Sequence, residues 1–173
     1  MAIRTDIFDL GGLRLTSGEG RRLTLAVALD PLVLAGERYT IEPVPLETRL
    51  DISRTTGDGY ALRLRFTARV VGPCMRCLAP AAPEFEVDSR EVSQPGAGEE
   101  LESPYVNGGD LDLRGWARDA LALALPSQIL CRPDCVGLCP VCGVNLAQAG
   151  PDHAHEREPD PRWAKLSELR IDP

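Results

Sequence analysis

Residues 131–143 read CRPDCVGLCPVCG, and they hold four of the six cysteines of the chain at C-x3-C-x3-C-x2-C spacing. The last five residues, Cys139 to Gly143, have the form of a zinc knuckle, in which two thiolates separated by two residues reach one metal ion. A glycine after the second cysteine lets backbone amides approach the sulfurs. Four thiolates in tetrahedral geometry are a usual structural zinc site. We therefore predict a zinc-stabilised segment here, with the rest of the chain presenting it.

A second C-x2-C pair lies upstream at Cys74 and Cys77. Six cysteines exceed the needs of one tetrahedral zinc, so three groupings are open. The preferred grouping is the four C-terminal cysteines alone. The other two join Cys74 and Cys77 either to the pair Cys139 and Cys142, as in a zinc ribbon, or to the pair Cys131 and Cys135. All six are candidate metal ligands, namely Cys131, Cys135, Cys139, Cys142, Cys74 and Cys77.

Other roles for the cysteines, and a role for the histidines as ligands, have less support in the sequence. His153 and His155 could be extra ligands, but they lie in a polar, proline-flanked stretch and are expected to be solvated. A redox-active C-x2-C normally opens a helix after a strand, whereas Cys74 and Cys77 lie between two predicted strands. Reduced thiols without metal remain the alternative to a zinc site. A site closed by four protein ligands leaves no position for catalysis, so zinc is expected to be structural.

Upstream of the cysteines, strands are predicted from alternating apolar and polar residues, and a helix from apolar residues three and four apart. The predicted strands are 22–29, 39–41, 46–53, 62–70 and 84–92, and the helix runs from about 113 to 125. The fold class is thus α+β: an antiparallel β-sheet, curled toward a barrel, covered by one main helix, with a C-terminal zinc-knuckle segment. The expected organisation is a sheet-plus-helix body over 1–130, a cysteine-rich segment over 131–146 and a polar tail over 147–173. That tail is expected to end in a short helix capped by Asp160.

The clearest local prediction is the hairpin around Gly57-Asp58-Gly59. Its apolar residues must share one face, which excludes a two-residue loop. A three-residue loop is preferred, and it pairs Ile52 with Leu64 and Leu50 with Phe66. It also sets Asp51 opposite Arg65 and Glu47 opposite Arg69.

A row of arginines follows the second strand of this hairpin and ends at the first C-x2-C pair. Its members are Arg63, Arg65, Arg69 and Arg76. Such a row can contact phosphates, so it is a candidate surface for nucleic acid or a partner protein. The alternative is a solvated sheet face in which the arginines pair with acidic residues of the neighbouring strand.

Composition limits the classes of function. The 173 residues carry a net charge of -7, which argues against non-specific coating of nucleic acid. We expect neither a signal peptide nor a membrane span, and a reducing, cytoplasmic location favours metal over disulfides for clustered cysteines. No P-loop, dinucleotide motif or nucleophile–base pattern stands out, so we expect no enzyme and no small-molecule substrate.

The order of these motifs resembles the YceD family of large ribosomal RNA subunit accumulation proteins. The resemblance rests on CMRCL (74–78), DLRGWARDALALALP (112–126), CRPDCVGLCPVCGVNL (131–146) and DPRWAKL (160–166). It implies a non-enzymatic bacterial factor for ribosome biogenesis, with the six cysteines as metal positions. Its expected partner is large-subunit ribosomal RNA or a ribosomal protein. The alternative is a zinc-ribbon adaptor that binds only protein.

Overall fold

The computed structural model describes residues 5–155 and 162, and it divides the chain into two compact units, 1–135 and 136–173. Each unit is considered separately below. The predicted terminal helix from Asp160 lies outside the described residues. The division after residue 135 separates the last two cysteines from the other four.

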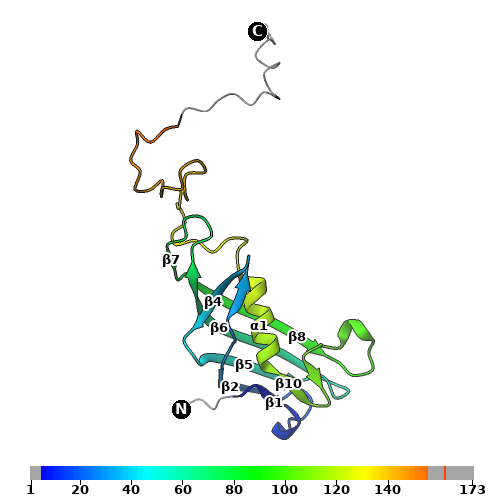
Figure 1. The fold of residues 1–173 in the computed structure, drawn as a ribbon. Coiled ribbons are helices and arrows are strands. Elements are labelled where there is room, and N and C mark those ends of the chain that lie inside the picture. The colour runs from blue at the N-terminus through cyan, green and yellow to red at the C-terminus, as the bar shows by residue number, and fades with distance from the viewer. Residues whose placement is uncertain (1–4, 156–161, 163–173) are drawn as a thin grey trace, which may run out of the picture. The chain divides into compact units, whose positions relative to one another are not determined.

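Unit 1 is built on a seven-stranded antiparallel sheet (Figure 1). Its strands are β2 (Gly20–Val27), β3 (Leu32–Leu34), β4 (Glu37–Glu42), β5 (Leu46–Arg54), β6 (Tyr60–Pro73), β7 (Pro80–Ala81) and β8 (Glu84–Ser93). Strand β6 is the centre of the sheet: it pairs with β5 and then β4 along one edge, and with β8 and then β7 along the other. The predicted strands over 22–29, 39–41, 46–53, 62–70 and 84–92 are thereby confirmed, with shifts of up to three residues at their ends.

The sheet does not close into a barrel, which corrects the expected curl. Its main path runs β2-β5-β6-β4-β3, and among the described strands β2 pairs only with β5 and β3 only with β4. Strands β4 and β5 share the same edge of β6, one beyond the other, so the sheet lengthens along β6 instead of wrapping around.

The β5–β6 hairpin has the predicted faces but a different register. Leu50 lies opposite Leu64 and Ile52 opposite Leu62, so each pair is shifted by two residues from the predicted one. A shift of two keeps every side chain on its predicted face. The loop spans residues 55–59 instead of three residues, and the Thr55 hydroxyl and the side chain of Gln94, at the end of β8, meet at 2.8 Å across it. The predicted opposition of Glu47 to Arg69 is wrong, because Arg69 lies opposite Glu42 of β4.

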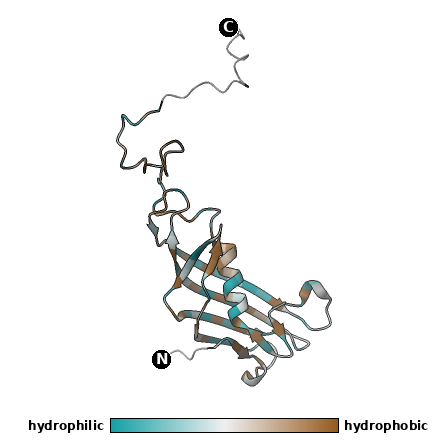
Figure 2. Cartoon of the chain, viewed as in Figure 1, coloured by the Kyte–Doolittle hydropathy of each residue, from teal (hydrophilic) through white to brown (hydrophobic). Residues whose placement is uncertain are grey.

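Helix α1 (Leu113–Ala124) covers the apolar face of the sheet (Figure 1). Asp112 caps its first turn by accepting a hydrogen bond from the Gly115 amide at 2.9 Å. Trp116 is 1% exposed and donates its indole N–H to Ser89 of β8 at 2.9 Å. The strands are banded by hydropathy in Figure 2, as expected when one face meets a helix and the other meets solvent.

Unit 1 also contains a small three-stranded sheet, whose last strand in the chain leads directly into α1. It consists of β1 (Ile7–Asp9), β10 (Asp110–Asp112) and β9 (Val106–Asn107), with short 3-10 turns at Gly11–Leu13 and Glu99–Leu101. Pairing of β1 with β10 ties the start of the chain to the residues that lead into α1. No helix in the described part of the chain is long and apolar enough to cross a membrane.

Residues 136–155 of unit 2 form a series of turns. Leu138 and Asn145 form an isolated antiparallel bridge, and the Leu146 amide donates to the Gly137 carbonyl at 3.0 Å. Its aliphatic side chains are not buried, and Val136, Val141 and Val144 are exposed, so side-chain packing cannot be its main source of order.

Candidate metal centres

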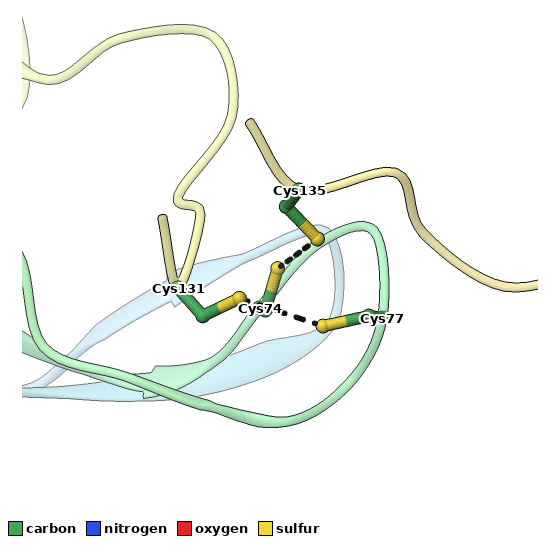
Figure 3. A group of neighbouring side chains, drawn as sticks. All are labelled: Cys74, Cys77, Cys131 and Cys135. Carbon is green, nitrogen blue, oxygen red and sulfur yellow. Dashed lines mark hydrogen bonds between the residues drawn. The ribbon is translucent and has the colours of Figure 1, made fainter. Parts of the chain in front are cut away.

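Four cysteines from two distant parts of unit 1 converge at one end of the sheet. Cys74 and Cys77 lie in the turn between β6 and β7, and Cys131 and Cys135 lie in the segment that follows α1 (Figure 3). We call these residues the four-cysteine cluster. Their sulfurs point toward one another and lie within 4.8 Å of each other.

The distances fit a tetrahedral metal ion. The Sγ atoms of Cys74 and Cys135 are 3.8 Å apart, and those of Cys77 and Cys131 are 3.6 Å apart. Four thiolates about 2.3 Å from one zinc ion would be separated by about 3.8 Å. The cluster can therefore hold a metal ion with its four sulfurs as ligands.

The backbone around Cys74 forms a knuckle. The Cys74 amide donates to the Ala79 carbonyl at 2.8 Å, and the Leu78 amide donates back to the Cys74 carbonyl at 2.9 Å. Leu78 takes a positive φ of 60°, a conformation that most residues avoid. This turn directs backbone amides toward the sulfurs.

Tyr39 anchors the start of the knuckle, at the end of β6, to the neighbouring strand β4. The phenolic O–H donates to the Pro73 carbonyl at 2.8 Å, next to Cys74. The Tyr39 ring approaches Gly72 so closely that a Cβ on this glycine would lie 2.3 Å from a ring carbon. Gly72 is thus needed for the ring to reach the end of β6.

Direct contacts also join the knuckle to the segment after α1. The Met75 amide donates to the Ile129 carbonyl at 2.8 Å, and Ile129 is 1% exposed. Arg76 donates to Gln128 at 2.9 Å and to the Cys135 carbonyl at 3.0 Å. An ion in the four-cysteine cluster would therefore reinforce a junction that the chain already forms.

The pKa values of Cys74 and Cys131 are shifted in opposite directions. Burial opposes ionisation of Cys74, but backbone amides of Arg76, Cys131 and Cys77 outweigh it and lower its pKa to about 6. Burial and the neighbouring sulfurs, Cys77 first among them, raise the pKa of Cys131 to about 12. Neighbouring thiolates repel one another, and this opposes ionisation of Cys131. A bound cation would offset that repulsion and let all four cysteines bind as thiolates.

Unit 2 holds a second set of possible ligands: Cys139, Cys142, His153 and His155. Their ligand atoms lie within 4.8 Å of one another. We call this set the Cys2His2 cluster. The result differs from the sequence prediction in two ways. The histidines lie beside Cys142, although His155 is exposed as expected, and the described residues offer two sets of four possible ligands instead of one.

The structure thus brings together the third of the three groupings, Cys74 and Cys77 with Cys131 and Cys135. The preferred grouping is split, because Cys131 and Cys135 belong to unit 1 whereas Cys139 and Cys142 belong to unit 2. His153 and His155 were considered as extra ligands but expected to be solvated, although the sequence carries a signal for them. They follow Cys142 in an H-x-H arrangement, and with the six cysteines they make eight soft or borderline ligands, enough for two tetrahedral sites.

The arginine row is engaged by the chain itself. Arg63 contacts Asp88, with its Nε 2.7 Å from a carboxylate oxygen, and this contact lowers the pKa of Asp88. Arg65 pairs with Asp51, and Arg69 lies 3.2 Å from Glu42. Arg76 makes the contacts to Gln128 and Cys135 described above. Binding of RNA or of a partner by this row stays a prediction.

Comparison with known proteins places the chain in a family. Residues 62–170 match the family model described as large ribosomal RNA subunit accumulation protein YceD. The chain belongs to the YceD family. The matched range includes most of β6, all of α1 and both clusters, so the resemblance seen in the sequence is confirmed.

Mycobacterial proteins are similar to this chain. Uncharacterized proteins of Mycobacterium tuberculosis and Mycobacterium bovis are 36% identical over 161 residues, covering 87% of this chain and 77% of theirs. An uncharacterized protein of Mycobacterium leprae is 32% identical over 174 residues, covering 94% of this chain and 76% of its own. No solved structure matched this YceD chain.

Proposed function

We propose that the protein is a non-enzymatic factor for large ribosomal subunit assembly, acting in the cytoplasm, where it supports accumulation of the subunit's RNA. The observation that carries the proposal is the match of residues 62–170 to the YceD family. It would act by binding ribosomal RNA or a ribosomal protein.

Zinc at the four-cysteine cluster is part of this proposal. Four thiolates in tetrahedral spacing are the donor set that structural zinc prefers. Such a site supplies all four ligands from the protein and leaves no position for water or substrate, which supports a role without catalysis. The ion would hold the β6–β7 turn against the segment that follows α1.

Charge favours a basic ribosomal protein over RNA as the direct partner. The chain carries a net charge of -7, and Arg63, Arg65 and Arg69 already face acidic side chains. A protein that binds RNA mainly through phosphates needs cations that its own carboxylates have not neutralised. The same observation supports the second candidate, an adaptor that binds protein without nucleic acid.

Crosslinking in living cells tests the proposal. The full-length chain would be tagged, crosslinked and purified under denaturing conditions, and the attached RNA and proteins identified, with a tagged unrelated acidic protein as control. We expect enrichment of large-subunit ribosomal RNA or of a large-subunit ribosomal protein. Two results together would overturn the proposal. Neither molecule would be attached, and depletion of the protein would leave the ratio of large- to small-subunit RNA unchanged.

Titration with RNA fragments at several salt concentrations separates the two partners. Direct phosphate contacts give an affinity that falls steeply with salt. A protein-only adaptor would show weak binding that does not distinguish large-subunit RNA from a random RNA of the same length.

A further inference from the structure

The two clusters use every cysteine and every histidine of the chain. The sequence has six cysteines and two histidines, and all eight fall into two sets of four. If these cysteines and histidines served only in packing, some of them would be expected to lie outside the two sets. The arrangement points to two ions rather than one.

The distances in the Cys2His2 cluster are close to those of a mixed sulfur and nitrogen tetrahedron. The Cys142 Sγ lies 3.6 Å from His153 Nε2 and 3.2 Å from His155 Nε2, and the two Nε2 atoms are 3.2 Å apart. Ligands around one zinc ion would be about 3.6 Å apart for sulfur and nitrogen, and about 3.3–3.4 Å apart for two nitrogens. The histidines therefore present the same ring nitrogen to one point in space.

The backbone repeats the knuckle of unit 1. The Cys139 amide donates to the Val144 carbonyl at 2.8 Å, and the Gly143 amide donates to the Cys139 carbonyl at 2.8 Å. These bonds have the same spacing as those of Cys74 with Ala79 and Leu78. Gly143 has a positive φ of 73°, at the position that Leu78 occupies in unit 1.

We propose that Cys139, Cys142, His153 and His155 bind a second zinc ion, independently of the four-cysteine cluster. Two thiolates and two neutral imidazoles balance the charge of a divalent ion, so this site is neutral when occupied. Binding releases the protons of any thiol that is not already ionised. The ion supplies the cross-link that residues 136–155 otherwise lack, because these residues bury little side chain.

The second ion is more accessible than the first. Cys142 and His155 are exposed, whereas three of the four cysteines in unit 1 are buried. A chelator can reach exposed ligands without the protein opening, so the second ion leaves faster. This inference concerns the metal content of the purified chain and does not depend on the role in ribosome assembly.

Metal content of the full chain gives the first test. The protein would be purified in reductant, saturated with zinc, freed of loosely held ions by gel filtration and analysed for zinc. We expect two ions per chain, and one in Cys142→Ser and in His155→Ala. Asp152→Asn, which changes a charge beside the histidines without removing a ligand, keeps two. One ion per chain in the parent, or two in both ligand variants, would overturn the proposal.

Cobalt replaces zinc as the second test, because its spectrum reports the ligands. Tetrahedral cobalt bound by two thiolates gives weaker thiolate-to-metal absorption than cobalt bound by four. On addition of a chelator we expect two phases, with the weaker spectrum lost first. His155→Ala should remove the fast phase and keep the slow one, and a fast phase that survives this variant would contradict the assignment. Far-ultraviolet circular dichroism checks that the sheet of each variant is folded.

Discussion

At the scale of single residues, Leu78 shows what the knuckle demands of the chain. It occupies the position after the second cysteine, where the other knuckle has Gly143, and it takes a positive φ of 60°. Its side chain is 65% exposed, so packing contributes little to offset the backbone strain.

Leu78→Gly should therefore stabilise the protein. A left-handed conformation costs a non-glycine residue about 1–2 kcal/mol, and the extra freedom of glycine in the unfolded chain costs about 0.5–1 kcal/mol. The expected net gain is roughly 0.5–1 kcal/mol, measured by urea unfolding of the zinc-loaded protein. Leu78→Ala is the control, because it removes the side chain but keeps the strain. A gain of the same size in alanine would show that the backbone is not the cause.

Asp51 predicts a pH dependence on the outer face of the sheet. Arg22 and Arg65 both contact its carboxylate, Arg22 most strongly, and together they lower its pKa below the ordinary 3.8. A lowered pKa means that the stabilisation is present above about pH 4 and is lost as the pH falls through the folded-state pKa.

Comparison of the parent with Asp51→Asn by denaturant unfolding measures this contribution. Partly exposed ion pairs contribute about 0.2–1 kcal/mol each, so the parent should be more stable by about 1 kcal/mol at pH 6. The difference should shrink below pH 4. A difference that stays constant down to pH 3 would mean that the charge of Asp51 is not its source.

At the scale of elements, what could be predicted from sequence depends on whether the deciding contact is local. Alternation from Leu23 onward was enough to predict β2, and the three- and four-residue spacing around Trp116 predicted α1 with its end near Leu125. The sequence predicted correctly which face of the hairpin each side chain occupies. Alternation alone, however, cannot separate a three-residue loop from a five-residue one, because both keep every side chain on the same face. The contact that fixes the longer loop comes from Gln94, about forty residues away, and no local pattern reveals it.

The N-cap of α1 gives a test at this scale. Asp112 accepts from the Gly115 amide, so Asp112→Ala should lower the free energy of unfolding by about 1 kcal/mol. Asp110→Ala removes the same charge two residues earlier and should change it by less than half as much. Urea unfolding followed by tryptophan fluorescence measures both. Equal losses would show that charge, not the cap, is responsible.

At the scale of the whole molecule, the ligand groupings follow from the fold. Spacing in the sequence favoured the four C-terminal cysteines because they are close along the chain. The structure instead uses α1 to return residues 131–135 to the β6–β7 turn, which leaves Cys139 and Cys142 to the histidines. The path of the helix across the sheet decides which ligands are grouped together, so the spacing of the cysteines alone could not predict the grouping.

The four-cysteine cluster should therefore stabilise all of unit 1. Cys74→Ser should destabilise it by about 4 kcal/mol or more, the scale expected when a structural metal is lost. Hydrogen exchange should show lost protection in β6, β7 and residues 125–135. His155→Ala, which alters only the other cluster, should leave exchange in these segments unchanged. Loss of protection confined to residues 131–135 in Cys74→Ser would contradict this role.

The most direct measurement is anomalous diffraction at the zinc absorption edge from crystals of the full chain. The account predicts a peak about 2.3 Å from each sulfur of Cys74, Cys77, Cys131 and Cys135. A peak held instead by Cys74 and Cys77 together with Cys139 and Cys142, or no peak among the first four sulfurs, would contradict it.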